Sequence, residues 1–237
     1  VVRLKSGDPY VFGRGGEEGA SLKKAGIPFE TIPGITSSIG GLAYAGIPIT
    51  HRDLAASFHV YTGHLNKSDQ QVDWKTAAAA EGTLVFLMGM SSLQEITNQL
   101  ISHGRDETTP AAVIQWASRK QQKTVTGTLA TIFEQAQKAK LEPPSLIVIG
   151  NVVNRRKDLN FFEERPLFSL SITVPYSKKR NMTNCLSDLG AEIVELPASS
   201  IQIFDEKIDF SEPKNIVFTD QLSIEMFIRA MKICGID

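Results

Sequence analysis

The residues whose spacing is most suggestive of chemistry lie in one glycine-rich stretch near the start of the chain. Residues 7–16 contain four glycines, at positions 7, 13, 15 and 16. Glycine has no Cβ, so a backbone rich in glycine can lie close to a bound ligand. A long surface turn has the same composition, and composition alone leaves the two interpretations equally open.

Familiar nucleotide-binding and hydrolase patterns do not fit this chain. Gly13 and Gly15 match the start of a dinucleotide-binding Gly-x-Gly-x-x-Gly pattern, but Glu18 stands where its last glycine belongs. The sequence contains neither Gly-x-x-x-x-Gly-Lys-Ser/Thr nor Gly-x-Ser-x-Gly. A phosphate loop and the usual hydrolase nucleophile turn are therefore excluded.

A second glycine-rich run, residues 33–41, precedes an expected helix. The hydroxyl of Thr36 or Ser37 can cap that helix, which is a purely structural role. The free amides at a helix N-terminus can also bind a carboxylate or a ribose oxygen. Spacing does not choose between the two roles.

The charged and metal-ligating residues offer weaker signals. The histidines form no His-x-x-x-His pair and have no Cys-x-x-Cys partner, so no metal site is expected; they are His51, His59, His64 and His103. Arg14 and Arg52 matter if the ligand is a polyanion, because guanidinium groups bind carboxylates bidentately. Taken singly, each is an ordinary surface charge.

Composition limits the function classes. The 237 residues suggest one or two domains, and 25 Lys+Arg against 26 Asp+Glu argue against a nucleic-acid protein with a broad basic surface. No apolar run is long enough for a membrane span. Two cysteines, Cys185 and Cys234, cannot build a disulfide framework, which fits the reducing cytoplasm. The chain opens with Val1 in a strand-like run, so we expect it to start inside a domain.

The elements that must position these residues alternate along the chain, which predicts an α/β fold. Strands are expected over 1–5, 28–32, 57–62, 83–88, 111–116, 122–127 and 145–150. Helices are expected over 16–25, 36–45, 71–80, 91–103 and 129–139. Glycines at positions 26, 46 and 104 mark three of the helix ends.

A charged, aromatic and proline-ended stretch over 151–168 marks a domain boundary. Beyond it we expect strands over 169–174, 192–196 and 214–219, and helices over 180–189 and 221–233. About 80 residues provide too few strands for a complete open sheet, so this second α/β domain is expected to be partial. The predicted domains are residues 1–157 and 158–237.

Residues 1–157 resemble the uroporphyrinogen-III C-methyltransferases of the tetrapyrrole methylase family. The resemblance depends on motifs that occur in order over some 150 residues: 2–9 (VRLKSGDP), 12–18 (FGRGGEE), 33–37 (PGITS), 45–52 (AGIPITHR), 62–64 (TGH), 87–89 (LMG) and 144–153 (PSLIVIGNVV).

The resemblance implies a two-lobed α/β methylase that is a homodimer, with S-adenosylmethionine between the lobes. Its N-terminal lobe is expected to be incomplete here, because the family's opening glycine-rich loop would precede Val1. Cofactor contacts are implied at Ser6, Gly7, Asp8, Val11, Thr36, Ser37, Met88 and Ala117. The family usually has glycine where this chain has Ser6.

The resemblance also implies the reaction, which is methylation of uroporphyrinogen III at C2 and C7 to give precorrin-2, without a metal. Arg14 and Glu17 match catalytic positions, and Arg14, Glu17 and Arg52 match substrate-binding positions. A sister methylase acting on a precorrin and a non-catalytic S-adenosylmethionine-binding module are the alternatives.

Residues 167–237 resemble, with fewer motifs, the start of a uroporphyrinogen-III synthase. The similar segments are 170–174 (LSITV), 189–197 (LGAEIVELP) and 216–219 (IVFT). The resemblance implies a fused protein of sirohaem or cobalamin synthesis, in which the synthase makes the substrate of the methylase.

Overall fold

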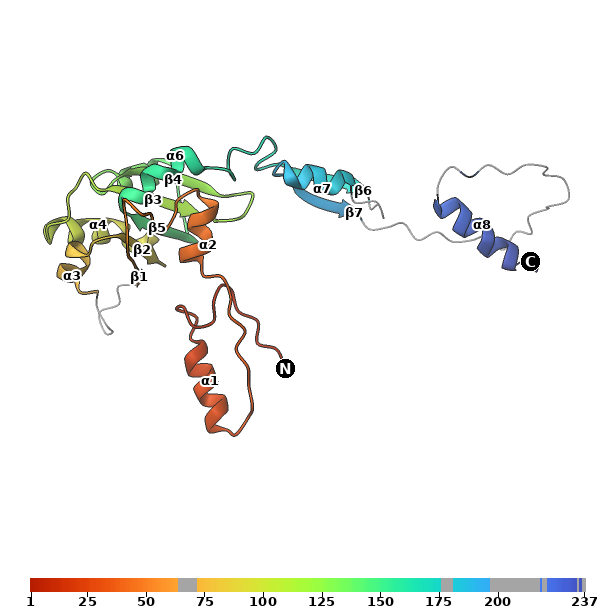
Figure 1. Cartoon of the computed structure of the whole chain (residues 1–237), viewed down its shortest axis with the longest axis horizontal. Coiled ribbons are helices and arrows are strands. Elements are labelled where there is room, and N and C mark those ends of the chain that lie inside the picture. Colours follow the sequence, from red (N-terminus) through yellow and green to blue (C-terminus); the bar gives the residue numbers. More distant parts are fainter. Residues whose placement is uncertain (64–71, 176–180, 197–217, 219–220, 234, 236–237) are drawn as a thin grey trace. The chain divides into compact units, whose positions relative to one another are not determined.

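The structure is a computed structural model that describes residues 1–63, 72–175, 181–196, 218, 221–233 and 235 (Figure 1). The chain forms two compact units. The first comprises residues 1–174 and 179–194, and the second comprises residues 175–178 and 195–237.

The first unit is built on a five-stranded sheet with the order β1-β2-β5-β3-β4. Its strands are β1 (Phe58–Thr62), β2 (Thr83–Leu87), β3 (Pro110–Gln115), β4 (Lys123–Thr128) and β5 (Ser145–Ile149). β1 is parallel to β2, whereas β5 is antiparallel to both β2 and β3. β1, β2 and β3 therefore run in one direction, and their carboxyl ends lie at one edge of the sheet.

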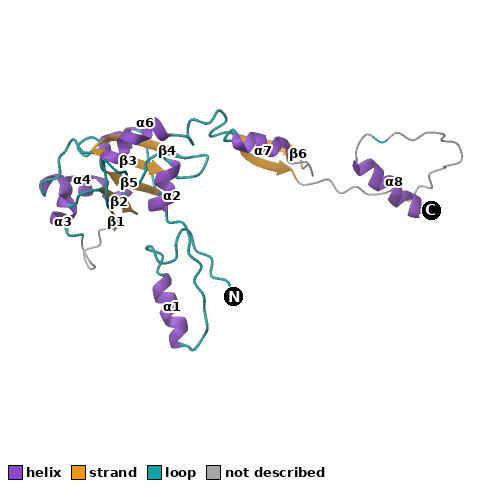
Figure 2. Cartoon of the chain, viewed as in Figure 1, coloured by secondary structure: helices purple, strands orange, loops and turns teal. Residues whose placement is uncertain are grey.

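Helices cover both faces of this sheet (Figure 2). One face packs against α3 (Trp74–Ala79), α4 (Leu93–Ser102) and α5 (Ile132–Lys138), whereas the other packs against α2 (Ser37–Tyr44) and the 3-10 helix η2 (Asn151–Arg155). Side chains alternate along β2, so that Leu84 and Phe86 join the first core and Val85 and Leu87 join the second. All five residues of β2 are buried, which explains its continuous apolar run.

The expected elements of the sheet and its helices are confirmed, with small shifts of their ends. Helix α1 (Gly15–Lys24) corresponds to the expected helix over 16–25. The expected helix over 91–103 divides into the 3-10 helix η1 (Met90–Ser92) and α4. Helix α3 begins after Asp73, whose carboxylate accepts a hydrogen bond from the Thr76 amide at 3.1 Å. Residue 71, where that helix was expected to begin, lies outside the described residues.

The strands expected over 1–5 and 28–32 are wrong. Both segments lack regular structure, and Val2, Leu4, Phe29 and Ile32 are exposed. An apolar, β-branched run becomes a strand only when its backbone pairs with a neighbouring strand. No strand in the described part of the chain pairs with either segment.

The boundary stretch is more structured than its composition suggested. Residues 151–159 form η2 and the short helix α6 (Arg156–Leu159), and Phe162 is buried. The two compact units are defined by contacts within the structure, so they do not test where one homologous module ends and the next begins. The division between residues 157 and 158 therefore stays a prediction.

Beyond this stretch, β6 (Ser171–Pro175) pairs with β7 (Glu192–Leu196), and α7 (Asn181–Asp188) lies between them in sequence. Helix α8 (Gln221–Ile233) belongs to the second unit. These elements match the expected strands and helices. The strand expected over 214–219 lies outside the described residues except at position 218.

Candidate functional site

The carboxyl ends of β1 and β2 approach each other closely at glycines. The Gly63 amide donates a 2.6 Å hydrogen bond to the Leu87 carbonyl. A Cβ on Gly63 would lie 2.3 Å from the Cα of Gly89, so no side chain fits between the segments that follow β1 and β2. Both glycines are buried, so the two strand ends pack directly against each other here.

Two large side chains project from the same edge. Met88 follows β2 and Trp116 follows β3, with φ angles of 57° and 49°, and they are 53% and 40% exposed. The register places them at a similar level on either side of β5, since β5 pairs Leu146 with Leu87 and Ser145 with Gln115. Residues other than glycine adopt such φ angles at a cost, and they often do so at binding sites.

Helix α2 lies against the loop that follows β3. A Cβ on Gly41 would lie 2.6 Å from Leu146 Cδ2 and 3.1 Å from the Cβ of Ala117. The structure therefore brings Ala117 to the helix whose first residue is Ser37. Thr36 is the N-cap residue, but its hydroxyl bonds the Ser38 hydroxyl at 3.1 Å and not a helix amide. The capping role considered for Thr36 is thus not made in this structure.

Asp8 joins the two glycine-rich segments. Its carboxylate accepts hydrogen bonds from the amides of Gly34 at 3.0 Å and Tyr10 at 2.8 Å. These bonds, that from Gly34 foremost, lower the pKa of the Asp8 carboxyl below its ordinary value. A Cβ on Gly34 would lie 2.1 Å from the Gly7 carbonyl oxygen, so this close approach requires glycine. The Asp8 carboxylate holds the loop through these bonds.

The structure thus gathers the residues implied as cofactor contacts into two adjoining groups. One is the loop that carries Ser6, Gly7, Asp8 and Val11, which meets the chain before α2. A Cβ on Gly7 would lie 3.8 Å from the Cα of Thr36. The other is the sheet edge, to which Ser37, Ala117 and Met88 belong. The chain from Thr36 to Ser37 connects the two groups.

The residues implied for substrate and proton transfer are exposed. Arg14 and Glu17 form an ion pair with a shortest N–O distance of 2.7 Å, and their side chains are 78% and 65% exposed. The hydrogen bond from Arg14 lowers the pKa of the Glu17 carboxyl. Arg52 is exposed in the turn between His51 and Ala55. Within the described residues it has no ionic or hydrogen-bonding partner, so the structure does not join it to the Arg14–Glu17 pair.

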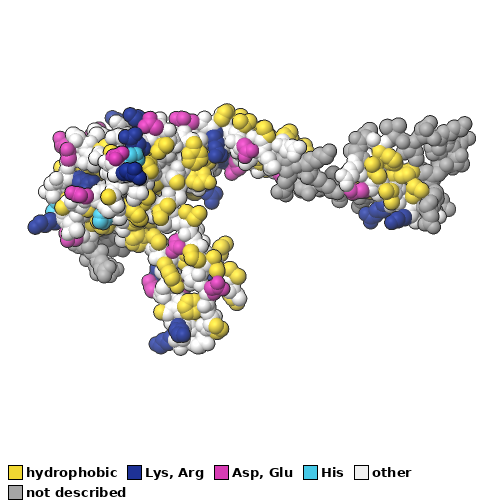
Figure 3. All heavy atoms as spheres, in the orientation of Figure 1, with side chains coloured by type: hydrophobic (Ala, Val, Ile, Leu, Met, Phe, Trp, Pro, Cys, Tyr) yellow, Lys and Arg dark blue, Asp and Glu magenta, His cyan; other side chains and the backbone are white. Residues whose placement is uncertain are grey.

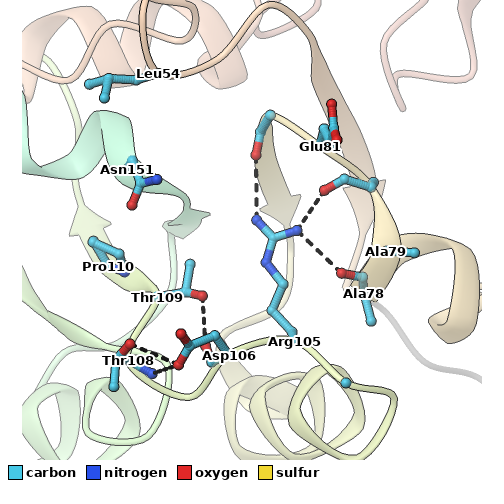
Figure 4. Close-up of a pocket in the computed structure, with 13 residues that line it drawn as sticks. Leu54, Ala78, Ala79, Glu81, Arg105, Asp106, Thr108, Thr109, Pro110 and Asn151 are labelled. Carbon is cyan, nitrogen blue, oxygen red and sulfur yellow. Dashed lines mark hydrogen bonds between the residues drawn. The ribbon is translucent and has the colours of Figure 1, made fainter.

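A cavity of about 550 Å³ opens at the opposite edge of the sheet (Figure 4). The Arg105 guanidinium there donates to the carbonyls of Ala80 at 2.6 Å and of Ala78 and Gly82 at 3.4 Å. It thereby caps the carboxyl end of α3, whose last carbonyls have no partner within the helix. Burial lowers the pKa of Arg105. We assign this cavity a structural origin, because Arg105 and Asp106 in its lining already serve the fold.

Other site types find little support in the described residues. None of the described helices has the length and apolarity of a membrane span. No three described His, Cys, Asp or Glu side chains lie together as metal ligands would. The motif residue His64 and the cysteine Cys234 lie outside the described residues.

Hydrophobic side chains gather on the surface of the N-terminal part, which includes α1 and α2 (Figure 3). The exposed members include Val2, Leu4, Tyr10, Phe12, Phe29, Ile32, Ile35 and Ile39.

Sequence reasoning assigned no individual role at the site to Gly63, Gly89 or Gln122. The two glycines belong to short motifs that are recognisable in the sequence. Gln122 belongs to none, and only its contacts single it out, as described below.

Comparison with known proteins identifies the family. Residues 1–132, more than half of the chain, match the Tetrapyrrole (Corrin/Porphyrin) Methylases. The chain belongs to this family.

Its curated relatives are named for two related activities. A Uroporphyrinogen-III C-methyltransferase from Bacillus subtilis is 52% identical over 164 residues, which cover 69% of this chain and 64% of the relative. Siroheme synthase 2 from Aeromonas salmonicida is 51% identical over 165 residues, covering 70% and 34%. Porphyrin biosynthesis protein HemD from Ruminiclostridium josui is 35% identical over 247 residues, covering 100% and 49%. The chain thus spans between a third and two thirds of the length of these relatives.

Solved structures share the fold. The uroporphyrin-III C-methyltransferase of Thermus thermophilus, complexed with S-adenyl homocysteine, is 40% identical with a TM-score of 0.57, covering 65% of this chain and 67% of that chain. A cobalt precorrin-4 methyltransferase has the same TM-score at 22% identity, which supports the fold alone.

Proposed function

We propose that the protein is an S-adenosylmethionine-dependent methyltransferase that methylates uroporphyrinogen III at C2 and C7 to precorrin-2, in sirohaem or cobalamin synthesis. The observation that carries the proposal is the sheet edge with Met88 and Ala117, against which α2 packs, and the start of α2, where Thr36 and Ser37 follow the segment bound to the Asp8 loop. A relative and a solved structure named for this activity match 69% and 65% of the chain, which supports the proposal.

The residues at this edge fit the cofactor. The close packing of Gly63 and Gly89 joins the ends of β1 and β2, and the exposed Met88 thioether provides a polarizable apolar contact. Backbone and hydroxyl groups at Ser6, Gly7, Val11, Thr36 and Ser37 provide hydrogen bonds, while Asp8 holds the loop that presents them. S-adenosylmethionine supplies an electrophilic methyl group when it is bound.

The chain's own part in the reaction is to bind and orient the macrocycle. Uroporphyrinogen carries several carboxylates, which planar guanidinium groups bind well. Arg52 is exposed without a partner among the described residues, so it can bind a substrate carboxylate without breaking an ion pair. Arg14 is held by Glu17, and a substrate carboxylate would compete for it. Once Arg14 binds the substrate, the pKa of the Glu17 carboxyl would rise toward its ordinary value. Glu17 could then accept the proton that the alkylated macrocycle must lose.

Calorimetry on the full-length protein tests the cofactor. We expect S-adenosylhomocysteine to bind with a chelator present, because no step of the proposal uses a metal. An absolute metal requirement, or no binding, would contradict the proposal.

Substitution of the arginines tests the substrate. Arg14→Lys and Arg52→Lys keep the charge and lose the planar fork, so methylation of uroporphyrinogen III should fall by about tenfold or more while S-adenosylhomocysteine affinity changes little. Lys24→Arg, on the exposed end of α1, is the control. Unchanged turnover in both variants at saturating cofactor would remove these residues from the site.

We further propose that residues 158–237 belong to a uroporphyrinogen-III synthase module. We also propose that the protein acts in the cytoplasm and forms a homodimer through its methylase part. The relative named HemD aligns with the whole chain, which supports the module. The resemblance to the methylase family supports the dimer. Lack of synthase activity in the full-length protein would contradict the first idea, and a monomer at micromolar concentration would contradict the second.

A further inference from the structure

A buried polar network lies near the carboxyl end of β3, and Gln122, just before β4, is at its centre. The side chain is 4% exposed and makes three hydrogen bonds. Its carbonyl oxygen accepts from the Ser118 amide at 2.7 Å. Its amide nitrogen donates to the Tyr44 carbonyl at 3.1 Å and to the Glu163 carboxylate at 2.8 Å. Gln122 therefore connects three segments that are distant in the sequence.

The first of these segments is the loop Trp116–Ser118, which includes Ala117. Trp116 and Ser118 have φ angles of 49° and 67°, a conformation that other contacts must maintain. The Trp116 amide donates to the Pro144 carbonyl at 3.1 Å, and Gln122 binds the Ser118 amide. Gln122 thus holds the far end of the loop that presents Ala117 to α2.

The second segment is the carboxyl end of α2. Gln122 binds the carbonyl of Tyr44, and Arg156 binds the carbonyl of Ala45. Carbonyls at a helix end have no partner within the helix, so these two side chains cap α2. The other end of α2 carries Thr36 and Ser37, two of the residues proposed to contact the cofactor.

The third segment is the stretch after α6. Glu163 accepts from Gln122, from the Thr124 hydroxyl at 2.5 Å and from Arg156 at 2.7 Å. The side chains of Arg156 and Glu163 are only 14% and 16% exposed. A buried ion pair of this kind adds little stability over well-packed apolar residues, whereas it can specify one arrangement.

We infer that Gln122, Glu163 and Arg156, here called the clasp, are positioning residues for the cofactor site. The clasp orients the loop Trp116–Ser118 and helix α2 together, and so sets the distance between Ala117 and the Thr36–Ser37 end of α2. None of the three is proposed to touch the cofactor. The inference rests on the proposed function, and it assigns a role in the methylase site to residues on both sides of the expected boundary at 157–158.

The test uses a charge exchange across the Gln122–Glu163 contact in the full-length protein. Gln122→Glu alone sets two buried carboxylates against each other and should weaken S-adenosylhomocysteine binding about tenfold or more. In the double variant Gln122→Glu/Glu163→Gln, residue 122 still accepts from the Ser118 amide and residue 163 can donate to it. The Tyr44 carbonyl loses its donor, so α2 keeps only the Arg156 contact at this end and recovery should be incomplete. We expect the double variant to recover affinity to within about threefold of wild type.

Two further measurements separate positioning from general stability. Ile132→Val removes a buried methylene in α5, remote from the clasp in the structure's other core, and serves as the control with a lowered melting temperature. It should leave affinity unchanged at a temperature where all variants are folded. In a Trp74→Phe background Trp116 is the sole tryptophan of residues 1–237, and its emission and quenching by acrylamide, measured on this chain, report the loop directly. They should change in Gln122→Glu and return in the double variant.

The outcomes are distinguishable. If the wild type does not bind S-adenosylhomocysteine, the proposed function fails. If the wild type binds and the Gln122→Glu variant binds equally well, or if Ile132→Val weakens binding as much, the clasp has no positioning role. Weak binding by Gln122→Glu with restored affinity and Trp116 emission in the double variant supports the inference.

Discussion

At the edge where β1, β2 and β3 end, the backbone adopts left-handed conformations and large side chains stay exposed, whereas at the opposite edge a cavity has its charged group already bonded. Met88 and Trp116 represent the first edge. Arg105, bonded to three carbonyls, represents the second. At the first edge, the left-handed φ angles of Met88 and Trp116 cost free energy, and the fold alone gives no reason for them. At the second edge, the hydrogen bonds of Arg105 explain why a charged group lies there.

The difference teaches that the volume of a cavity is a poor guide to function in this molecule. The cavity of about 550 Å³ is lined by groups that cap α3 and close a turn. The other edge combines glycines that permit close approach with two large side chains, Met88 and Trp116, that stay exposed. The proposed site is distinguished by its costly backbone conformations and exposed side chains, and not by a large cavity.

The largest expected effect comes from placing a charge at the first edge. Met88→Glu should weaken S-adenosylhomocysteine binding by about a hundredfold, or roughly 2.8 kcal/mol, because a carboxylate replaces an apolar contact. Met88 is half exposed, so the free energy of unfolding should change by less than about 0.5 kcal/mol. Calorimetry and urea unfolding measure the two quantities.

The matched control places the same charge at the other edge. Asn151 lines the cavity and is exposed, so Asn151→Glu should leave binding unchanged. Unfolding of the Met88→Glu variant, seen by circular dichroism, would instead identify Met88 as an ordinary core residue. Equal losses of affinity in both variants would remove the distinction between the edges.

An intermediate effect, on stability alone, is expected from Arg105→Met. The substitution keeps much of the side-chain volume but leaves the carbonyls of Ala78, Ala80 and Gly82 without their donor. We expect a loss of about 1–2 kcal/mol in the free energy of unfolding. Affinity for S-adenosylhomocysteine should stay within about twofold of wild type. A marked loss of affinity would mean that the cavity edge contributes to the cofactor site.

The smallest effect concerns pH. The pKa of Asp8 is lowered by the amides of Gly34 and Tyr10, so its ionised form stabilises the folded loop. That stabilisation is present above about pH 4, the ordinary range for aspartate, and is lost as the pH falls through the lower pKa of the folded state. Asp8→Asn should therefore show a shallower loss of stability between about pH 5 and pH 2.5 than wild type. Parallel curves for the two proteins would show that Asp8 does not bind the loop as described.

Much of the fold was predictable from the sequence, and the exceptions share one cause. β2 and β5 are continuous apolar runs, and α4 buries Leu93, Ile96 and Leu100 at helical spacing, so local pattern and packing agree. The segments over 1–5 and 28–32 also have strand-like composition, yet they lack a partner in the described structure. Pairing is a tertiary property that local composition does not report.

The sequence by itself determined the family, the glycines and the residue types of the candidate site, because these depend on the order of short motifs along the chain. It also indicated that Met88 stands at the end of an apolar strand. Only the tertiary structure decided that Met88, Ala117 and Ser37 share one edge, since this follows from strand order and register. The role of Asp8 as a bridge and that of Gln122 as a clasp likewise depend on hydrogen bonds between segments 26 to 78 residues apart. Contacts at such separations arise from packing, and local sequence carries no direct signal of them.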